Sequence, residues 1–95
     1  MAKFVFAYHG GKAPTDKAAI AKAMDAWGAW FAGMGAAVID AGNPVGKSYT
    51  VKSDGKLSEG GGPNPISGYS LIEAKTLEDA HKKARGCPIL AAGGS

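Results

Sequence analysis

The strongest constraint on the fold is a long helical pattern that lies between two short runs typical of β-strands. From Lys17 to about Met34, large apolar residues recur at helical spacing. These residues are Ile20, Met24, Trp27, Phe31 and Met34, with Ala23 and Trp30 beside them. Lys3–His9 before this segment is β-branched and aromatic, and Ala36–Ala41 after it is a second apolar run. Because the helix has one apolar face, we expect it to pack on a sheet.

The second half of the chain predicts shorter elements. Ser48–Lys52 alternates like a short strand and precedes a hairpin-type turn at 53–56. Ser58–Pro65 is too rich in Gly and Pro to be regular, and Ile66–Ala74 is a further strand.

A second helix is predicted from a capping-box-like start at Thr76 to Arg85, with Gly86 as its cap. His81 falls on the predicted apolar stripe of this helix, so we expect it in the core. Cys87 is expected to be a buried small hydrophobic residue.

This order predicts an α+β sandwich in a single domain spanning 1–95, with two helices on one face of a mainly antiparallel sheet. A ferredoxin-like fold needs one more strand after Gly86, and only Ile89–Ala92 there could be extended. Either that final strand is missing from this chain, or a neighbouring subunit covers the sheet edge. The other sheet face carries apolar residues such as Val5 and Ala7, or their alternates, so we expect a homodimer.

Composition narrows the classes of function. With 45% hydrophobic and 20% charged residues, the chain is typical of a folded globular protein. It lacks an apolar run of roughly 18–20 residues and a signal-peptide pattern, so no membrane partner and a cytoplasmic location are expected. The net charge of +3 comes from scattered basic residues, which argues against a nucleic-acid partner. One cysteine and two distant histidines give no metal-ligand spacing, so no metal is expected.

The stretch "AGNPVGKS" at 41–48 superficially resembles a phosphate-binding loop. That motif needs four residues between its glycines, but only three separate Gly42 from Gly46. Pro44 removes a backbone amide, and the following "SYTV" does not begin a helix. The stretch is therefore predicted to connect two strands, and no nucleotide or other cofactor is expected.

Three segments carry a resemblance to a known family: "WGAWFAGMGAAVIDAGNPVG", "DGKLSEGGGPNPISGYSLIEA" and "TLEDAHKKARGCPIL". Together they resemble the YCII-related proteins, in the branch labelled DGPF-domain, over nearly the whole chain. The resemblance implies a ferredoxin-like fold that dimerises through its sheets into an α/β barrel. It also implies a final strand after "GGS", which this sequence lacks.

Some members of that family are implicated in cofactor-free elimination chemistry, such as dehydrochlorination. They use a His–Asp dyad whose His lies on the first helix. The corresponding region here is "MDAWGAW", with Trp27 or its neighbours in place of that His. The inherited dyad is therefore not intact in this chain.

Two polar residues at strand ends are the candidate catalytic pair. His9 precedes Gly10 and is either a solvated or capped strand end, or a general base or ligand donor. The second interpretation is open because imidazole has an ordinary pKa near 6.5, which suits proton transfer at neutral pH. Asp40 interrupts an apolar strand, where its carboxylate either is solvated, caps a turn or is held by a partner. If the two strand ends are neighbours and the side chains face each other, His9 and Asp40 could form a substitute dyad. Their side-chain heavy atoms would then lie within hydrogen-bond reach, roughly 2.6–3.2 Å.

Four further residues are candidates for ligand binding: Trp27, Trp30, Tyr69 and Ser70. For the two tryptophans the alternative is core or interface packing, and for Tyr69 it is packing or a dimer contact. Tyr69 and Ser70 point to opposite faces of their strand, so at most one faces a given cavity.

The sequence therefore predicts a homodimeric α/β-barrel protein with a pocket for a small organic ligand. One alternative is a cofactor-independent enzyme of lyase or isomerase type that uses His9 and Asp40. A second is a structural or accessory dimer module without turnover.

Overall fold

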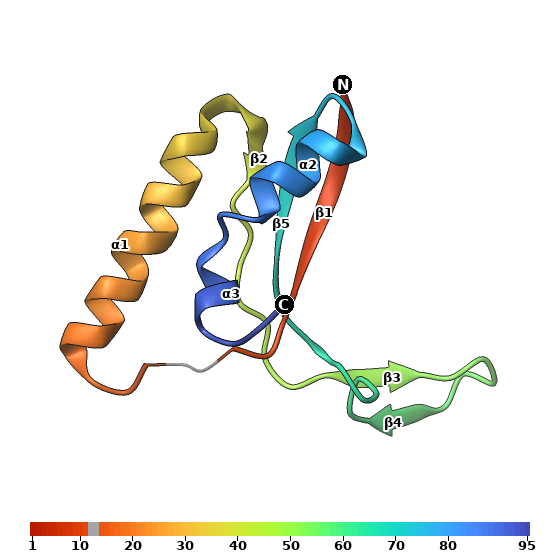
Figure 1. Ribbon diagram of the computed structural model, residues 1–95. Helices are drawn as coiled ribbons and strands as arrows, with labels where there is room; N and C mark the ends of the chain where they lie inside the picture. Colours follow the sequence, from red (N-terminus) through yellow and green to blue (C-terminus); the bar gives the residue numbers. More distant parts are fainter. Residues whose placement is uncertain (12–13) are drawn as a thin grey trace.

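The computed structural model describes residues 1–11 and 14–95 and has an α+β architecture with antiparallel sheets (Figure 1). The main sheet has the strand order β1-β5-β2, and its strands are β1 (Ala2–His9), β5 (Ile66–Ala74) and β2 (Val38–Asp40). The α-helices of the described residues are α1 (Lys17–Met34), α2 (Leu77–Ala84) and α3 (Pro88–Ala91). A 3₁₀ turn, η1 (Gly35–Ala37), joins α1 to β2. The predicted arrangement of helices on a mainly antiparallel sheet is thus confirmed, and it is compatible with a ferredoxin-like fold.

The two long strands place alternate side chains in the core, as their period-two pattern predicts. Phe4 lies opposite Ile72 in the β1–β5 register, and Val5 lies opposite Leu71. Ile72 is fully buried, whereas Val5, on the other sheet face, is 64% exposed. The core therefore lies on the helix side of the sheet, and the opposite face is open in the single chain.

Helix α1 begins where expected but does not pack along its whole length. The Asp16 side chain caps it by accepting a hydrogen bond from the Ala19 amide at 2.7 Å. Ile20 and Met24 were predicted on the packed face, yet they are 41% and 69% exposed. The first half of α1 stands away from the sheet in Figure 1, which explains why only the later part of the predicted stripe reaches the core.

Helix α2 corrects a second expectation about burial. His81 was expected in the core, but its side chain is exposed, and Leu77 is 73% exposed. Ala80 is the residue of α2 that is buried, because the helix turns its small side chains toward the sheet. Cys87, just beyond α2, is 5% exposed, which confirms its predicted burial.

The end of the chain forms no regular strand. Residues that could have been extended instead form α3, in which Pro88 occupies the first turn. The chain then returns to β1, where Ser95 and His9 exchange two backbone hydrogen bonds of 2.7 and 2.9 Å. Because β5 pairs with the other edge of β1, Ser95 lies on the outer edge of the sheet.

A separate hairpin consists of β3 (Tyr49–Val51) and β4 (Leu57–Glu59), and it projects from the body of the molecule (Figure 1). The turn at 53–56 was predicted. The irregular loop predicted from Ser58 was not fully correct, because Ser58 and Glu59 belong to β4 and pair with Thr50 and Tyr49. Within the described residues, no helix is long and apolar enough to cross a membrane.

Candidate ligand pocket

A cavity of about 800 Å³ lies between α1, helix α3 and one end of the main sheet. Side chains of α1 and α3 form two of its walls. The loops that follow β1 and β2 form the rest, together with Gly68 and its neighbours on β5. Its volume is within the range of ligand-binding clefts, roughly 300–1,000 Å³. The small side chains of Ala23 and Ala26 leave room along the α1 wall beside the large rings of Trp27 and Phe31.

Aromatic rings form one side of this pocket. Tyr8 meets Trp27 edge-on with their ring centroids 5.1 Å apart, and Trp27 lies 5.9 Å from Phe31. These three side chains line the cavity. Such edge-to-face contacts fix the ring positions beyond what burial alone provides.

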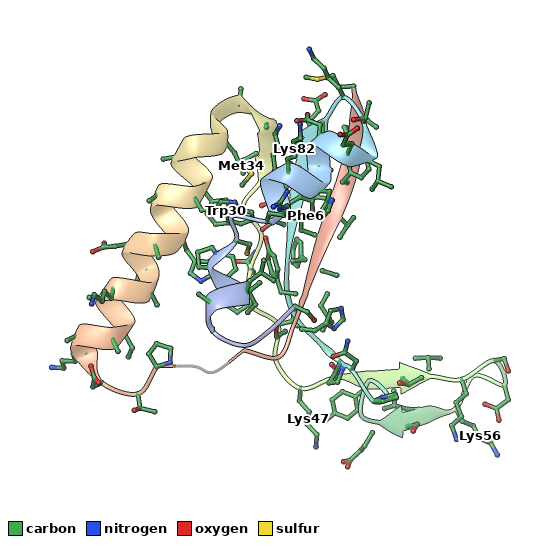
Figure 2. All side chains as sticks on the ribbon, viewed as in Figure 1. Phe6, Trp30, Met34, Lys47, Lys56 and Lys82 are labelled. Atoms are coloured by element: carbon green, nitrogen blue, oxygen red, sulfur yellow. The ribbon has the colours of Figure 1, made fainter. Side chains whose placement is uncertain are left out.

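Trp30 belongs to the same aromatic cluster but not to the pocket lining. Figure 2 shows Trp30 reaching from α1 toward Phe6 on β1, and their rings stack with centroids 6.2 Å apart. Its indole Nε1 donates a hydrogen bond of 2.9 Å to the carbonyl oxygen of Lys83 in α2. Trp30 therefore joins α1 to the sheet and to α2, whereas Trp27 faces the cavity.

A buried hydrogen-bond chain holds the tyrosine at the pocket. The Tyr8 hydroxyl donates to Ser70 Oγ at 2.7 Å, and Ser70 Oγ donates to the carbonyl oxygen of Ala41 at 2.7 Å. Ser70 is fully buried and does not line the cavity, so it orients Tyr8 rather than touching a ligand there. Burial raises the pKa of Tyr8 to about 12, partly offset by the hydrogen bond to Ser70, and Cys87 adds to the rise. The Tyr8 phenol is therefore neutral at physiological pH.

Asp40 shapes the pocket wall indirectly. Its Oδ1 accepts a hydrogen bond of 2.8 Å from the amide of Gly42, closing a tight turn after β2. Gly42 has φ +79° and lies so close to β5 that a Cβ atom there would be 1.6 Å from the Tyr69 carbonyl oxygen. Asp40 thus has the turn-capping role that was one of its predicted alternatives.

His9 and Asp40 are not brought together within one chain. His9 Nδ1 lies 3.2 Å from the carbonyl oxygen of Pro65, and His9 pairs opposite Ile66 on one side of β5. Asp40 pairs opposite Leu71 on the other side of β5. At about 3.3 Å per residue, these positions are on the order of 15 Å apart along the strand. The substitute dyad proposed from the sequence is therefore not formed in the single chain.

Tyr69 borders the pocket and Ser70 does not, in keeping with their opposite directions on β5. Tyr8 is a residue at this site that sequence reasoning missed. The period-two pattern puts Tyr8 on the same face of β1 as Phe4 and Phe6, but the serine that accepts its hydroxyl hydrogen bond is 62 residues away. Only the β1–β5 register reveals that the two side chains meet.

The pocket carries little charge. Of the described residues that line it, Lys22 alone has a charged side chain, and none has a carboxylate. Burial raises the pKa of the Cys87 thiol, which disfavours a reactive thiolate. Over residues 1–11 and 14–95, no three or more His, Cys, Asp or Glu side chains gather in a way that could hold a metal ion.

Comparison of the chain with family models, with curated proteins and with solved structures found no match. The resemblance to the YCII-related family therefore stays a prediction from the residues that carry it.

Proposed function

We propose that this protein binds a small, largely apolar organic molecule in the cavity between α1, α3 and the sheet. The observation that carries the proposal is the cavity itself, about 800 Å³, bordered by Tyr8, Trp27 and Phe31. A folded domain rarely leaves space of this size beside its aromatic side chains unless a ligand or partner occupies it. The fixed Tyr8–Ser70 hydrogen bond supports the same proposal, since it holds one wall in a defined position before binding.

Binding without turnover is favoured over a lyase or isomerase reaction. The expected base, His9, and the expected orienting carboxylate, Asp40, make separate hydrogen bonds in the single chain. The Tyr8 hydroxyl is held neutral by burial, so it is a poor base near neutral pH. The function proposed is therefore recognition rather than catalysis.

The protein is further proposed to be a YCII-related homodimer, with the open sheet faces of two copies packed together as in a dimeric α/β barrel. Val5 at 64% exposure and Ile39 at 42% exposure support this assembly, because apolar side chains on an open sheet face favour burial. The pairing of Ser95 with His9 on the outer edge of β1 supports a ferredoxin-like sheet, in which a further strand pairs along that edge. Light scattering across micromolar concentrations is expected to give twice the monomer mass, and a monomer would contradict the dimer.

A larger side chain placed in the cavity tests whether ligands bind there. Ala23→Phe adds a ring to the cavity wall, whereas Ala29→Phe adds the same ring to an exposed position of α1 outside the cavity. A screen of small aromatic and aliphatic compounds by thermal shift is expected to yield ligands that raise the Tm of the parent and of Ala29→Phe. Ala23→Phe should keep its fold by circular dichroism and lose those shifts. Equal shifts in all three proteins would show that the ligands bind elsewhere.

A further inference from the structure

The distribution of charge around the pocket points to the chemical class of its ligand, and this inference rests on the function proposed above. Among the described residues of the lining, Lys22 supplies the one charged side chain, and it comes from the second turn of α1. The other lining groups are apolar side chains, backbone amides and neutral polar groups such as Asn43. A ligand that matches this lining has an apolar body and a single negative charge.

The position of Lys22 fixes which end of the cavity is charged. On α1, Lys22 precedes Ala26 by four residues, so the two share one flank of the face that Ala23 and Trp27 present to the cavity. Lys22 is exposed, so its charged end stays in contact with water while its side chain contributes to the lining. Phe31, further along α1, and Tyr8 on β1 supply neutral aromatic parts of the same lining.

Lys22 also has no carboxylate partner among the described residues. The two salt bridges within that part of the chain are Lys47–Glu59 at 3.4 Å and Lys83–Asp79 at 2.9 Å. Since none of the described lining residues has a carboxylate, an anionic ligand group there meets the attraction of Lys22 and no repulsion from those residues.

We infer that the ligand is an apolar monocarboxylic acid, whose hydrocarbon or aromatic body occupies the cavity and whose carboxylate pairs with the Lys22 ammonium. A nucleotide or sugar phosphate does not match, because one exposed cation and an apolar wall leave its charges and hydroxyls without partners. A neutral apolar molecule would fill the same space but would gain nothing from Lys22.

The test compares an acid with its uncharged isostere. The probes are 1-naphthaleneacetate and 1-naphthaleneacetamide, titrated against the parent protein and two variants with ligand-observed NMR. Lys22→Gln removes the pocket charge, and Lys17→Gln removes a charge from the same helix outside the pocket lining. We expect the acid to bind the parent about three- to fivefold more tightly than the amide, the upper part of the range expected for an exposed ion pair.

That preference should fall to within about twofold in Lys22→Gln, persist in Lys17→Gln and shrink as salt is raised. If acid and amide bind equally and both are lost in Ala23→Phe, the pocket binds ligands but the carboxylate inference is overturned. If neither probe binds in a manner sensitive to Ala23→Phe, the proposed function fails and the inference fails with it. A preference for the acid that survives Lys22→Gln would assign the charge recognition to another group and also overturn the inference.

Discussion

The β1–β5 pair and the β3–β4 hairpin are both antiparallel, but they lie in different environments. In β5, alternate side chains such as Ser70 and Ile72 are fully buried beneath the helices. In the hairpin, Val51 lies opposite Leu57, and these side chains are 71% and 67% exposed. The difference lies in what packs on the strands, because helices cover one face of β5 and none covers the hairpin.

The hairpin is instead held by local interactions. Thr50 Oγ1 donates a hydrogen bond of 2.7 Å to the carbonyl oxygen of Gly60, and the Lys47 ammonium lies 5.5 Å from the centre of the Tyr49 ring. Lys47 also pairs with Glu59, although both side chains are largely exposed. An isolated two-stranded hairpin is marginally stable in water. We therefore expect substitutions in the main sheet to affect the whole fold and equivalent substitutions in the hairpin to have small effects.

The largest expected difference in stability between the main sheet and the hairpin comes from substituting one glycine in each region. Gly42 and Gly55 both have positive φ, at +79° and +86°, but Gly42 lies against the Tyr69 carbonyl and Gly55 has open space around it. Gly42→Ala is expected to cost about 4 kcal/mol or more, because the new Cβ clashes with backbone that no side-chain rotation can move. Gly55→Ala should cost only the backbone strain, about 1–2 kcal/mol.

Urea unfolding followed by far-UV circular dichroism measures both variants. Similar costs at the two positions would contradict the close packing of the Asp40–Gly42 turn against β5. That result would also remove the structural reason for the role assigned to Asp40.

The next test compares two aliphatic side chains in paired strands. Ile72 is fully buried in β5, and truncation to Ala is expected to cost about 3 kcal/mol from lost burial and the cavity left behind. Val51→Ala in the hairpin should change stability by no more than about 0.5 kcal/mol, since that side chain is 71% exposed. A cost for Val51→Ala close to that of Ile72→Ala would mean that the hairpin face is covered in solution, for example by a second copy.

The sequence predicted the elements better than the surfaces that they bury. The strands 3–9 and 66–74 and the helix from Lys17 were recognisable because their periods are local properties of the chain. The packed face of α1 was predicted wrongly at Ile20 and Met24, because an apolar side chain is buried only where a partner approaches it. The same reason explains His81, which shares the predicted stripe of α2 but faces solvent.

The candidate site was harder to predict because it depends on contacts between distant segments. Trp27 was named as a candidate and lines the cavity, but the cavity itself depends on how far α1 stands from the sheet. Neither the Tyr8–Ser70 hydrogen bond nor the separation of His9 from Asp40 could be read from spacing. Both follow from the order β1-β5-β2, which places β5 between the two strands that carry His9 and Asp40.

The smallest expected effect is a dependence of stability on alkaline pH that arises in the main sheet. The pKa of Tyr8 is about 12 in the folded protein, mainly because of burial, against about 10 in an unfolded chain. The folded state thus holds the phenol proton more tightly than the unfolded chain does. The neutral phenol therefore makes its full contribution to the free energy of unfolding below pH 10, and this contribution is lost as pH rises toward 12.

Urea unfolding between pH 9 and 12 should show a shallower loss of stability in Tyr8→Phe than in the parent. Tyr49→Phe, a matched change on a hairpin side chain that is 51% exposed, should follow the parent. A parent-like slope in Tyr8→Phe would contradict a buried tyrosine at the pocket wall, because an exposed phenol would ionise alike in both states.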